Sequence, residues 1–303
     1  MGALLLIIPP GTLAILATLQ GSLYTFDNMG ILYLVATPIG NLEDISARAL
    51  QVLRDVSFIL AEDTRHTGKL LKHYGITTPQ ISYFEHNKLA KLETILVKLD
   101  EGDLALVSDA GTPALNDPGY ELVRAALEAG HQVMPIPGPS APIAALVASG
   151  LPTDRFLYLG YLKRKATERR RQLREIQDLP FTLIFLETPH RLNAALLDLQ
   201  SELGNRQVAV ARELTKLHEE IYRGAISEAL TYFEADPPRG EITLVVDGAH
   251  PESTRWLPEQ VREALGDGLA RGESVSALAR EISTQSGWNR RDVYRIATEM
   301  NQA

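Results

Sequence analysis

The sequence predicts two α/β domains followed by a small helical domain. From residue 30 to about 150, short apolar runs alternate with amphipathic stretches, which is typical of a mostly parallel sheet with helices on both faces. The same alternation resumes after a break at Leu151–Pro152 and continues to Gly248. Beyond that point only amphipathic helical patterns remain. A chain of 303 residues is also long enough for more than one domain.

Residues 1–29 are expected to lie outside the fold. The segment is rich in Leu, Ile and Ala, but Pro9, Pro10 and Gly11 interrupt it and no Lys or Arg precedes the apolar run. It therefore matches a secretory signal poorly and is too broken for a membrane-spanning helix. Met29 stands directly before the first clear strand. We expect translation to begin there, with a cleaved leader as the alternative.

The first domain is predicted to span residues 30–151. A helix over 119–130 ends at Gly130, a residue that commonly closes helices. The other predicted helix covers 46–55, and the predicted strands cover 31–36, 56–62, 104–109 and 131–137.

The second domain is predicted to span 152–250, and a three-helix domain 255–303. In the second domain we expect strands at 156–162, 181–187, 207–213 and 241–248, and helices at 166–178, 191–203 and 225–235. The terminal helices are expected at 258–272, 274–287 and 289–302, with Ser274 and Asn289 as N-caps. This unit resembles a helix-turn-helix domain whose last helix opens with Arg290 and Arg291, or equally a packing or dimerisation bundle.

Composition excludes several classes of site. The chain has no cysteine, so disulfides, thiolate nucleophiles and Cys-type zinc sites are excluded, and a reducing compartment such as the cytoplasm is favoured. No spacing typical of a P-loop, a dinucleotide-binding motif or a His-rich metal site occurs, so we expect no metal. The net charge of -8 argues against non-specific coating of nucleic acid.

Four loops follow the predicted strands of the first domain and favour a ligand-binding cleft. The transition from strand to loop is most abrupt in Leu104–Gly119, where four apolar residues are followed by a segment that contains Gly111 and Pro113. One such loop is as easily an ordinary turn. In a parallel sheet, however, all four lie at the edge where ligands bind. The loops cover residues 37–41, 62–67, 110–113 and 137–141.

A run of basic residues follows the first strand of the second domain. Only Glu168 opposes it, and such a run binds phosphates in a salt-dependent way, with a solvated helix face as the alternative. We expect RNA contacts from Lys163, Arg164, Lys165, Arg169, Arg170 and Arg171.

Seven stretches together resemble a known family. They are YLVATPIGNLEDIS (33–46), AEDTRHT (61–67), VSDAGTPALNDPG (107–119), PGPSA (137–141), LGYLKRK (159–165), ETPHRL (187–192) and RELTKLHEE (212–220). In this order they are similar to the ribosomal RNA small subunit methyltransferase I family of the tetrapyrrole methylase superfamily. The resemblance extends from Gly30 to the C-terminus.

The resemblance implies S-adenosylmethionine as the methyl donor and the ribose 2′-hydroxyl of a cytidine in 16S ribosomal RNA of the small subunit as the acceptor. It also implies two α/β domains of the tetrapyrrole methylase type with the cofactor in the cleft between them, a homodimer, no metal and no membrane. Departures at His66 and at Asn116–Asp117 are minor. By analogy, the cofactor-binding residues are Pro38, Ala110, Gly111, Thr112, Leu115, Ser140, Ala141, Glu187 and Leu214.

A ribose hydroxyl is a weak nucleophile, so the reaction needs a base or a cation that stabilises the developing alkoxide. Our preferred hypothesis is that Asp63 with Arg65, and Lys216, shape the acceptor side. The alternative for Asp63 and Arg65 is a mutual ion pair that holds their loop. The further candidates are Glu187 and Glu213 as bases, and His66 and Arg191 as cations.

Two other functions fit the same pattern less well. A tetrapyrrole C-methyltransferase would share the fold and the donor but would need neither the basic run nor the terminal helices. A ligand-sensing regulator would bind DNA through the helix-turn-helix-like domain and an effector through the α/β part. Binding of the donor without methyl transfer to 30S subunits would favour the regulator.

Overall fold

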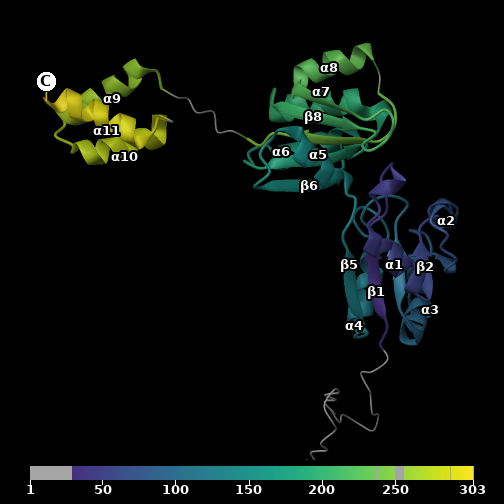
Figure 1. Ribbon diagram of the computed structural model, residues 1–303. Helices are drawn as coiled ribbons and strands as arrows, with labels where there is room; N and C mark the ends of the chain where they lie inside the picture. The colour runs from purple at the N-terminus through teal and green to yellow at the C-terminus, as the bar shows by residue number, and fades with distance from the viewer. Residues whose placement is uncertain (1–28, 237, 250–255, 287, 303) are drawn as a thin grey trace, which may run out of the picture.

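The computed structural model describes residues 29–236, 238–249, 256–286 and 288–302, which form two α/β domains and a helical bundle (Figure 1). The predicted N-terminal extension lies outside the described residues, except for Met29. Within the described ranges, no helix combines the length and the apolar character that crossing a bilayer requires.

The first domain contains a five-stranded, fully parallel sheet with the order β3-β2-β4-β1-β5. Its strands are β1 (Ile31–Val35), β2 (Phe58–Ala61), β3 (Gln80–Ser82), β4 (Leu104–Val107) and β5 (Gln132–Ile136). Its helices are α1 (Ala47–Asp55), α2 (Thr64–His73), α3 (Lys88–Glu101) and α4 (Tyr120–Glu128). The predicted parallel sheet is confirmed.

Helices cover both faces of this sheet because its central strands are apolar on both sides. In β4, Ala105 and Val107 face the cluster formed with α1 and α2, whereas Leu104 and Leu106 face the cluster formed with α3 and α4. All four side chains are buried. A continuous apolar run of this kind is typical of a parallel strand between two helical layers. The carboxyl ends of these strands meet at the edge that faces the second domain (Figure 1).

The second domain contains a mixed sheet with the order β6-β7-β10-β8-β9. Strands β6 and β7 are parallel, and the remaining neighbours are antiparallel. The strands are β6 (Phe156–Tyr161), β7 (Thr182–Glu187), β8 (Gln207–Arg212), β9 (Glu220–Ala225) and β10 (Ile242–Val246). One face packs against α6 (Ala166–Glu175), α7 (Leu192–Leu203) and α8 (Ile226–Ala235).

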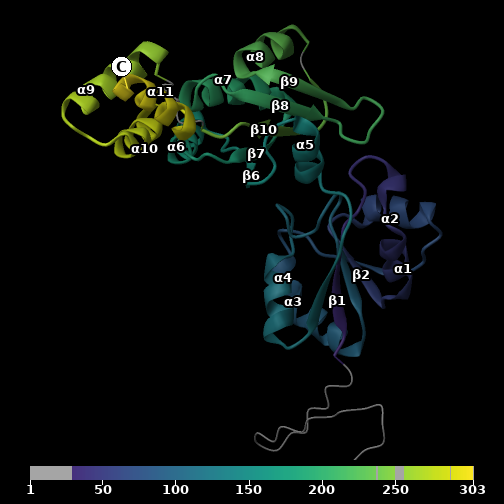
Figure 2. The same ribbon diagram turned by 60° about the vertical axis from the view of Figure 1, so that its left-hand side comes forward.

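The other face of this sheet is covered by α5 (Ala141–Ser149), which the sequence had placed in the first domain. Ala145 and Leu146 of α5 pack with Ile184 and Val245 of the second sheet. Figure 2 shows α5 on the side of that sheet that faces the first domain. The break at Leu151–Pro152 is only the connection into β6. By packing, the second domain therefore begins near residue 140 rather than at 152, because the apolar side chains of α5 find their partners on the second sheet.

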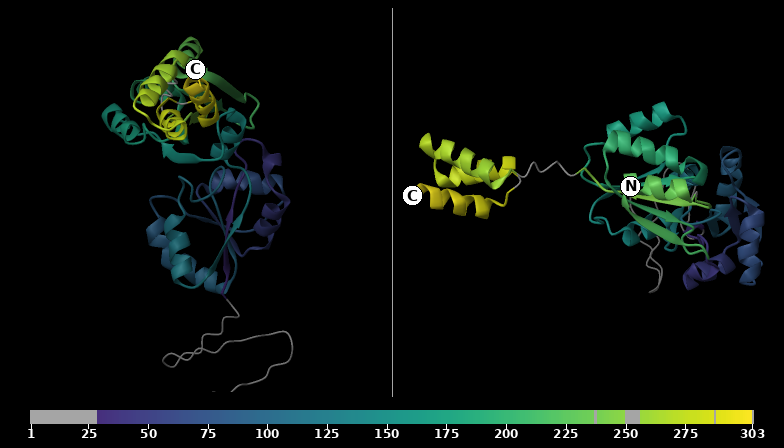
Figure 3. Two further views of the ribbon diagram at one scale, coloured as in Figure 1. Left: turned by 90° about the vertical axis from the view of Figure 1, so that its left-hand side faces the viewer. Right: turned by 90° about the horizontal axis from the view of Figure 1, so that it is seen from above.

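The C-terminal bundle consists of α9 (Pro258–Ala270), α10 (Val275–Ser286) and α11 (Arg290–Gln302). Its core contains residues of these helices and their flanks alone. The predicted caps are present, since Ser274 Oγ accepts from the Ala277 amide at 3.3 Å and Asn289 Oδ1 from the Arg291 amide at 2.9 Å. The bundle lies apart from both α/β domains (Figures 1 and 3).

Candidate active site

A cavity of about 300 Å³ lies between the two α/β domains, which we term the interdomain cavity. The first domain contributes the loop 109–117 after β4, together with Ile39 and Glu62. The second contributes the start of α5, Tyr158 and Tyr161 of β6, and residues at the end of β7 and the beginning of β10. The wall from the first domain thus follows the carboxyl ends of β1, β2 and β4, where ligands bind in parallel sheets.

The loop after β4 is held in a strained conformation. Gly111 has a φ of +80° and exchanges two backbone hydrogen bonds with Thr37, of 2.9 and 3.0 Å. Ala114 and Asn116 have φ values of 65° and 66°, a region that side chains rarely adopt. Non-glycine residues with positive φ gather at functional sites, where the surrounding structure holds them.

Most of the expected cofactor residues line this cavity. Those on its wall are Ala110, Gly111, Thr112, Leu115, Ser140, Ala141 and Glu187. Pro38 lies instead in a small neighbouring hollow with His66 and Asp109. Leu214 packs against the apolar cluster between α5 and the second sheet. Pro38 and Leu214 therefore lie beside the cavity wall rather than on it, although Ile39 of the same loop as Pro38 lines it.

Apart from Glu187, the acidic and aromatic residues of the wall were not among the predicted site residues. Glu62 and Asp109 stand just beyond β2 and β4, so their place at the strand ends was the signal that pointed to them. Nothing local marks Tyr158, Tyr161 or Glu241, because the order of strands in the second sheet brings them to the cavity. The wall residues with polar or ionisable side chains that were not among the predicted site residues are Glu62, Asp109, Asn116, Asp117, Tyr158, Tyr161, Thr188, Glu241 and Thr243.

Carboxyl groups of the first domain are close enough to perturb each other. Burial raises the pKa of Glu62, and the charges of Asp117 and Asp109 raise it further. Burial also raises the pKa of Asp117, against a hydrogen bond with Ser108 and with the help of the Asp109 charge. Asp109 in turn accepts a 3.0 Å hydrogen bond from the Asp63 amide. This side of the cavity is therefore acidic, and Glu62 and Asp117 hold their protons more tightly than usual.

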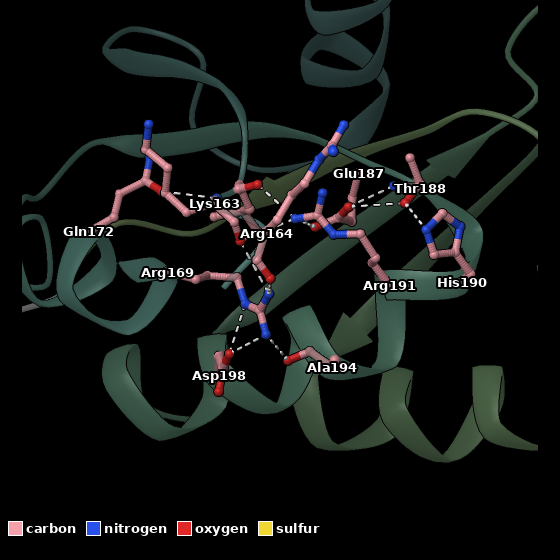
Figure 4. A network of polar contacts seen from close by, with 11 residues as sticks. Lys163, Arg164, Arg169, Gln172, Glu187, Thr188, His190, Arg191, Ala194 and Asp198 are labelled. Carbon is pink, nitrogen blue, oxygen red and sulfur yellow. Dashed lines mark hydrogen bonds and ion pairs between the residues drawn. The ribbon is translucent and has the colours of Figure 1, made fainter. Parts of the chain in front are cut away.

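Glu187, at the end of β7, is a buried carboxyl group with one unsatisfied oxygen. Its Oε1 accepts a 2.8 Å hydrogen bond from the Thr188 amide. Its Oε2 has no hydrogen bond and lies 3.2 Å from Nη2 of Arg191 as an ion pair (Figure 4). Burial raises the pKa of Glu187, opposed by the Thr188 amide and the Arg191 charge.

Asp63 and Arg65 form the mutual ion pair that was the alternative to a catalytic role. Asp63 is the N-cap of α2, where its Oδ1 accepts a 2.8 Å hydrogen bond from the Arg65 amide. The Arg65 guanidinium lies 2.7 Å from Asp63 Oδ2 and is exposed. Hydrogen bonds from Arg65 hold the pKa of Asp63 well below its usual range. Neither residue lines the interdomain cavity, and the lowered pKa makes Asp63 a weak base.

Lys216 lies where the loops of the two domains meet. Its Nζ is 2.8 Å from Glu213 and 3.0 Å from Glu241, a cavity residue. Although partial burial opposes it, hydrogen bonds to these two carboxylates raise the pKa of Lys216. A Cβ on Gly40 of the first domain would lie 2.4 Å from Lys216 Cγ, so the glycine permits this close contact. The candidate base Glu213 has a lowered pKa, chiefly through its hydrogen bond with Lys216.

The basic run divides into exposed and buried residues. Lys163, Arg164, Lys165, Arg170 and Arg171 are exposed, as RNA contacts require. Arg169 is buried, and the expectation that it contacts RNA is wrong. Its Nε donates to Oδ2 of Asp198 on α7 at 2.7 Å, and its Nη1 to two backbone carbonyls. One turn of α6 faces α7, and the sequence alone does not mark which arginine lies there.

Comparison with known proteins identifies the family. The model of the tetrapyrrole (corrin/porphyrin) methylases matches residues 31–230. A curated relative from Synechocystis, ribosomal RNA small subunit methyltransferase I, is 49% identical over 275 residues, which cover 90% of this chain and 99% of the relative. The protein of the same name from Escherichia coli O157:H7 is 47% identical, with 90% and 96% covered.

Solved structures share the fold at low sequence identity. A diphthine synthase structure has a TM-score of 0.54 at 16% identity, with 72% of this chain and 90% of that chain covered. For a uroporphyrin-III-C-methyltransferase from Thermus thermophilus the TM-score is 0.50 at 20% identity, with 71% and 94% covered. From the family match and the close relatives, the chain belongs to the tetrapyrrole methylase family, and within it to the ribosomal RNA small subunit methyltransferase I family.

Proposed function

We propose that this protein transfers a methyl group from S-adenosylmethionine to the ribose 2′-hydroxyl of a cytidine in 16S ribosomal RNA. The observation that carries the proposal is the interdomain cavity, walled by both domains, in a chain nearly half identical to proteins named ribosomal RNA small subunit methyltransferase I. The assignment of the ribose 2′-hydroxyl as the acceptor atom, and of cytidine as the nucleotide, rests on the resemblance of the sequence motifs. The proposed place of action is the cytoplasm, where small subunits are assembled.

The residues present fit the cofactor. A cavity of about 300 Å³ is within the range of small-molecule sites. Gly111 leaves space for a ligand to approach the backbone, and the buried Glu187 Oε2 offers a free acceptor. Glu62, Asp109 and Asp117 provide negative charge opposite a cationic sulfonium and ammonium. When bound, S-adenosylmethionine supplies an activated methyl group and a thioether leaving group.

The chain's own residues have two tasks, which are to align the acceptor and to accept its proton. The strained loop 110–117 and the start of α5 fix the donor side of the cavity. Glu62 and Asp117 have raised pKa values and line the cavity, so they suit the role of base better than Asp63. We assign Lys216 to the acceptor side, where it holds Glu241, and the exposed guanidinium of Arg65 to the approaching RNA.

The RNA is proposed to reach the cavity over the exposed part of the basic run. Lys163, Arg164 and Lys165 follow β6 directly, and β6 also carries the cavity residues Tyr158 and Tyr161. A backbone phosphate bound by the loop would thus lie next to the mouth of the cavity. Arg170 and Arg171 extend the same charge along α6. A further proposal, from the family resemblance, is that two copies associate, which sedimentation velocity would test.

The direct test is incubation of 30S subunits lacking the modification with the enzyme and isotopically labelled S-adenosylmethionine, followed by mass mapping of RNA fragments. We expect one label per subunit, on the ribose of a cytidine. Lys216→Ala should reduce the rate at least tenfold, and Lys72→Ala on the far end of α2 should leave it unchanged. Label on a base or on ribosomal protein, or label only on uroporphyrinogen offered in parallel, would contradict the proposal.

A further inference from the structure

Two guanidinium groups, one buried and one half-buried, bind the backbone carbonyls of the loop that carries the exposed cations. We term residues 162–165 the cationic loop. Arg191 Nη2 donates to the carbonyl of Leu162 at 2.7 Å and to that of Lys163 at 3.2 Å. Arg169 Nη1 donates to the carbonyls of Lys163 and Arg164, at 3.2 and 3.3 Å. Three consecutive carbonyls therefore point into the domain.

The two anchors are held in different ways. Arg169 is tied to Asp198, whose side chain is 3% exposed, so it links the cationic loop only to α7. Arg191 is 17% exposed and forms its ion pair with Glu187, on the wall of the interdomain cavity. Figure 4 shows Arg191 between Glu187 and the backbone of Lys163. Arg191 alone of the two touches both the cationic loop and a cavity residue.

The contact between Arg191 and Glu187 leaves a buried polar atom of each side chain without a hydrogen bond. Glu187 Oε2 is buried without a hydrogen bond, although it lies 3.2 Å from Arg191 Nη2. Arg191 Nε is also buried without a partner. Unsatisfied buried polar atoms are costly, so a ligand donor at Oε2 would fix the carboxylate and, through it, the guanidinium.

We infer that Arg191 is a positioning residue that couples binding of the cofactor in the interdomain cavity to binding of RNA on the cationic loop. This rests on the proposed function, of which it names an internal coupling. A donor group of the cofactor on Glu187 orders Arg191, and Arg191 orders the carbonyls of residues 162 and 163. RNA phosphates on Lys163 and Arg164 order the same loop from outside. Each ligand then meets a network that the other has already ordered, so the cooperativity is positive and reciprocal.

The test measures RNA affinity with and without the cofactor product. The affinity of unmodified 30S subunits for the full-length protein is measured with and without saturating S-adenosylhomocysteine. We expect the wild type to bind at least about fivefold more tightly with it, which is the lower end of typical couplings. Arg191→Lys should bring this ratio close to one. A lysine ammonium is a single point charge that can neutralise Glu187 but cannot also hold two carbonyls in a planar fork.

Two controls separate coupling from damage. Arg171→Gln removes an exposed cation that touches neither the cationic loop's carbonyls nor Glu187, so it should weaken RNA binding while the ratio stays at the wild-type value. S-adenosylhomocysteine affinity of Arg191→Lys in the absence of RNA should stay within about threefold of wild type. A wild-type ratio of one, or an unchanged ratio in Arg191→Lys, would overturn the inference even if the enzyme methylates its RNA. A wild type that binds no 30S subunits at all would overturn the proposed function with it.

If Arg191→Lys does not fold, hydrogen exchange on the wild type decides the matter. S-adenosylhomocysteine should slow exchange of the amides of residues 163–165, which lie outside the cavity wall, and leave those of the outer end of α6 unchanged. Unaltered exchange over 163–165 at saturation would refute the coupling.

Discussion

At the scale of the residue, Arg169 and Arg171, two positions apart on α6, have different roles. The side chain of Arg169 is 5% exposed and that of its partner Asp198 is 3% exposed. Arg171 is 74% exposed and only 3.9 Å from Glu175, a weak surface pair. Burial, not residue type, thus decides whether a cation is available to RNA.

We therefore expect Arg169→Gln to lower the free energy of unfolding by about 1–3 kcal/mol, because the buried Asp198 carboxylate loses one partner and keeps the 2.6 Å ion pair with Arg170. Arg171→Gln should change it by no more than about 0.5 kcal/mol. Urea unfolding followed by circular dichroism measures both values. Arg171→Gln should also reduce the slope of log affinity for RNA against log salt by about 0.7–0.9. Equal stability of the two variants would show that the Arg169–Asp198 pair is not structural.

Asp117 predicts a pH dependence of stability. Burial raises its pKa in the folded protein above the unfolded value, so the folded state binds this proton more tightly. The stabilising contribution is complete below the unfolded pKa and is lost as the pH rises through the folded pKa. At pH 7 the ionised group is therefore unfavourable for folding.

Asp117→Asn keeps a side-chain oxygen near Ser108 but cannot ionise. We expect it to raise the free energy of unfolding at pH 7 and to leave it nearly unchanged at pH 3, as measured by urea unfolding at both values. Methyl transfer should fall in the same variant if Asp117 accepts the proton. If Asp117→Asn were less stable than wild type at pH 7 and equally stable at pH 3, the raised pKa of Asp117 would be contradicted.

At the scale of the element, α5 determines where the second domain begins. Ala145 and Leu146 are fully or nearly fully buried against Ile184, Ala209 and Val245. Without α5, this face of the second sheet would be open to water. Exposing apolar surface to water costs about 25 cal/mol per Å².

A fragment of residues 138–249 should consequently unfold cooperatively in urea, whereas a fragment of 152–249 should bind a hydrophobic dye and show no sharp transition. The two fragments share every strand of the second sheet and differ in α5 and its flanks. Cooperative unfolding of the shorter fragment, at the same midpoint, would place α5 with the first domain after all.

The sequence was sufficient for the elements whose apolar pattern is strong. β4 and β10 are buried along their whole length, and both were predicted. β3 and β9, each at a sheet edge, were missed because β3 has only three residues and β9 is largely half-buried, whereas the longer apolar runs of the edge strands β5 and β6 were predicted. Edge strands bury less surface, so their composition carries a weaker signal.

The candidate site could be predicted in part, since residue patterns indicated the loops after the parallel strands and the start of α5, whereas Glu187 of the second sheet was expected only from the family resemblance. Loops with Gly and Pro after parallel strands reveal the wall that contains Gly111, because the strand order does not matter when all carboxyl ends share an edge. The opposite wall depends on which strands of a mixed sheet become neighbours. Tyr158, Glu187 and Glu241 come together only because β6, β7 and β10 are adjacent, and no local pattern specifies that order.

At the scale of the whole molecule, two close approaches fix the α/β domains around the cavity. Gly40 lies against Lys216, and Gly160, with a φ of +63°, lies against Asn116. A Cβ at these glycines would come within 2.4 Å of the opposing side chain. The domains therefore meet at Gly40 with Lys216 and at Asn116 with Gly160 of β6, and the walls of the cavity depend on both contacts.

The C-terminal bundle stands outside this arrangement. Among the residues that the structure describes, its buried side chains, such as Val261, Leu278 and Val293, form an apolar core with other parts of the bundle alone. The Trp288 indole donates to the Trp256 carbonyl at 2.7 Å and joins the ends of the unit. A chain that ends at residue 249 should therefore keep the unfolding temperature of the α/β domains and bind S-adenosylhomocysteine within about twofold of the full chain.

The same truncation distinguishes the two interpretations of the bundle. Arg290 and Arg291 are exposed at the start of α11, and within the described part of the chain neither forms an ion pair. Free cations at that position favour binding of RNA phosphates over a packing role. We expect the truncated chain to bind 30S subunits more weakly, with the salt slope reduced by about 1 for each phosphate that the bundle no longer neutralises. Arg290→Gln with Arg291→Gln in the full chain should reproduce this reduction without altering sedimentation. A dimerisation bundle would give the opposite result, in which truncation changes the sedimentation coefficient and the double substitution changes nothing.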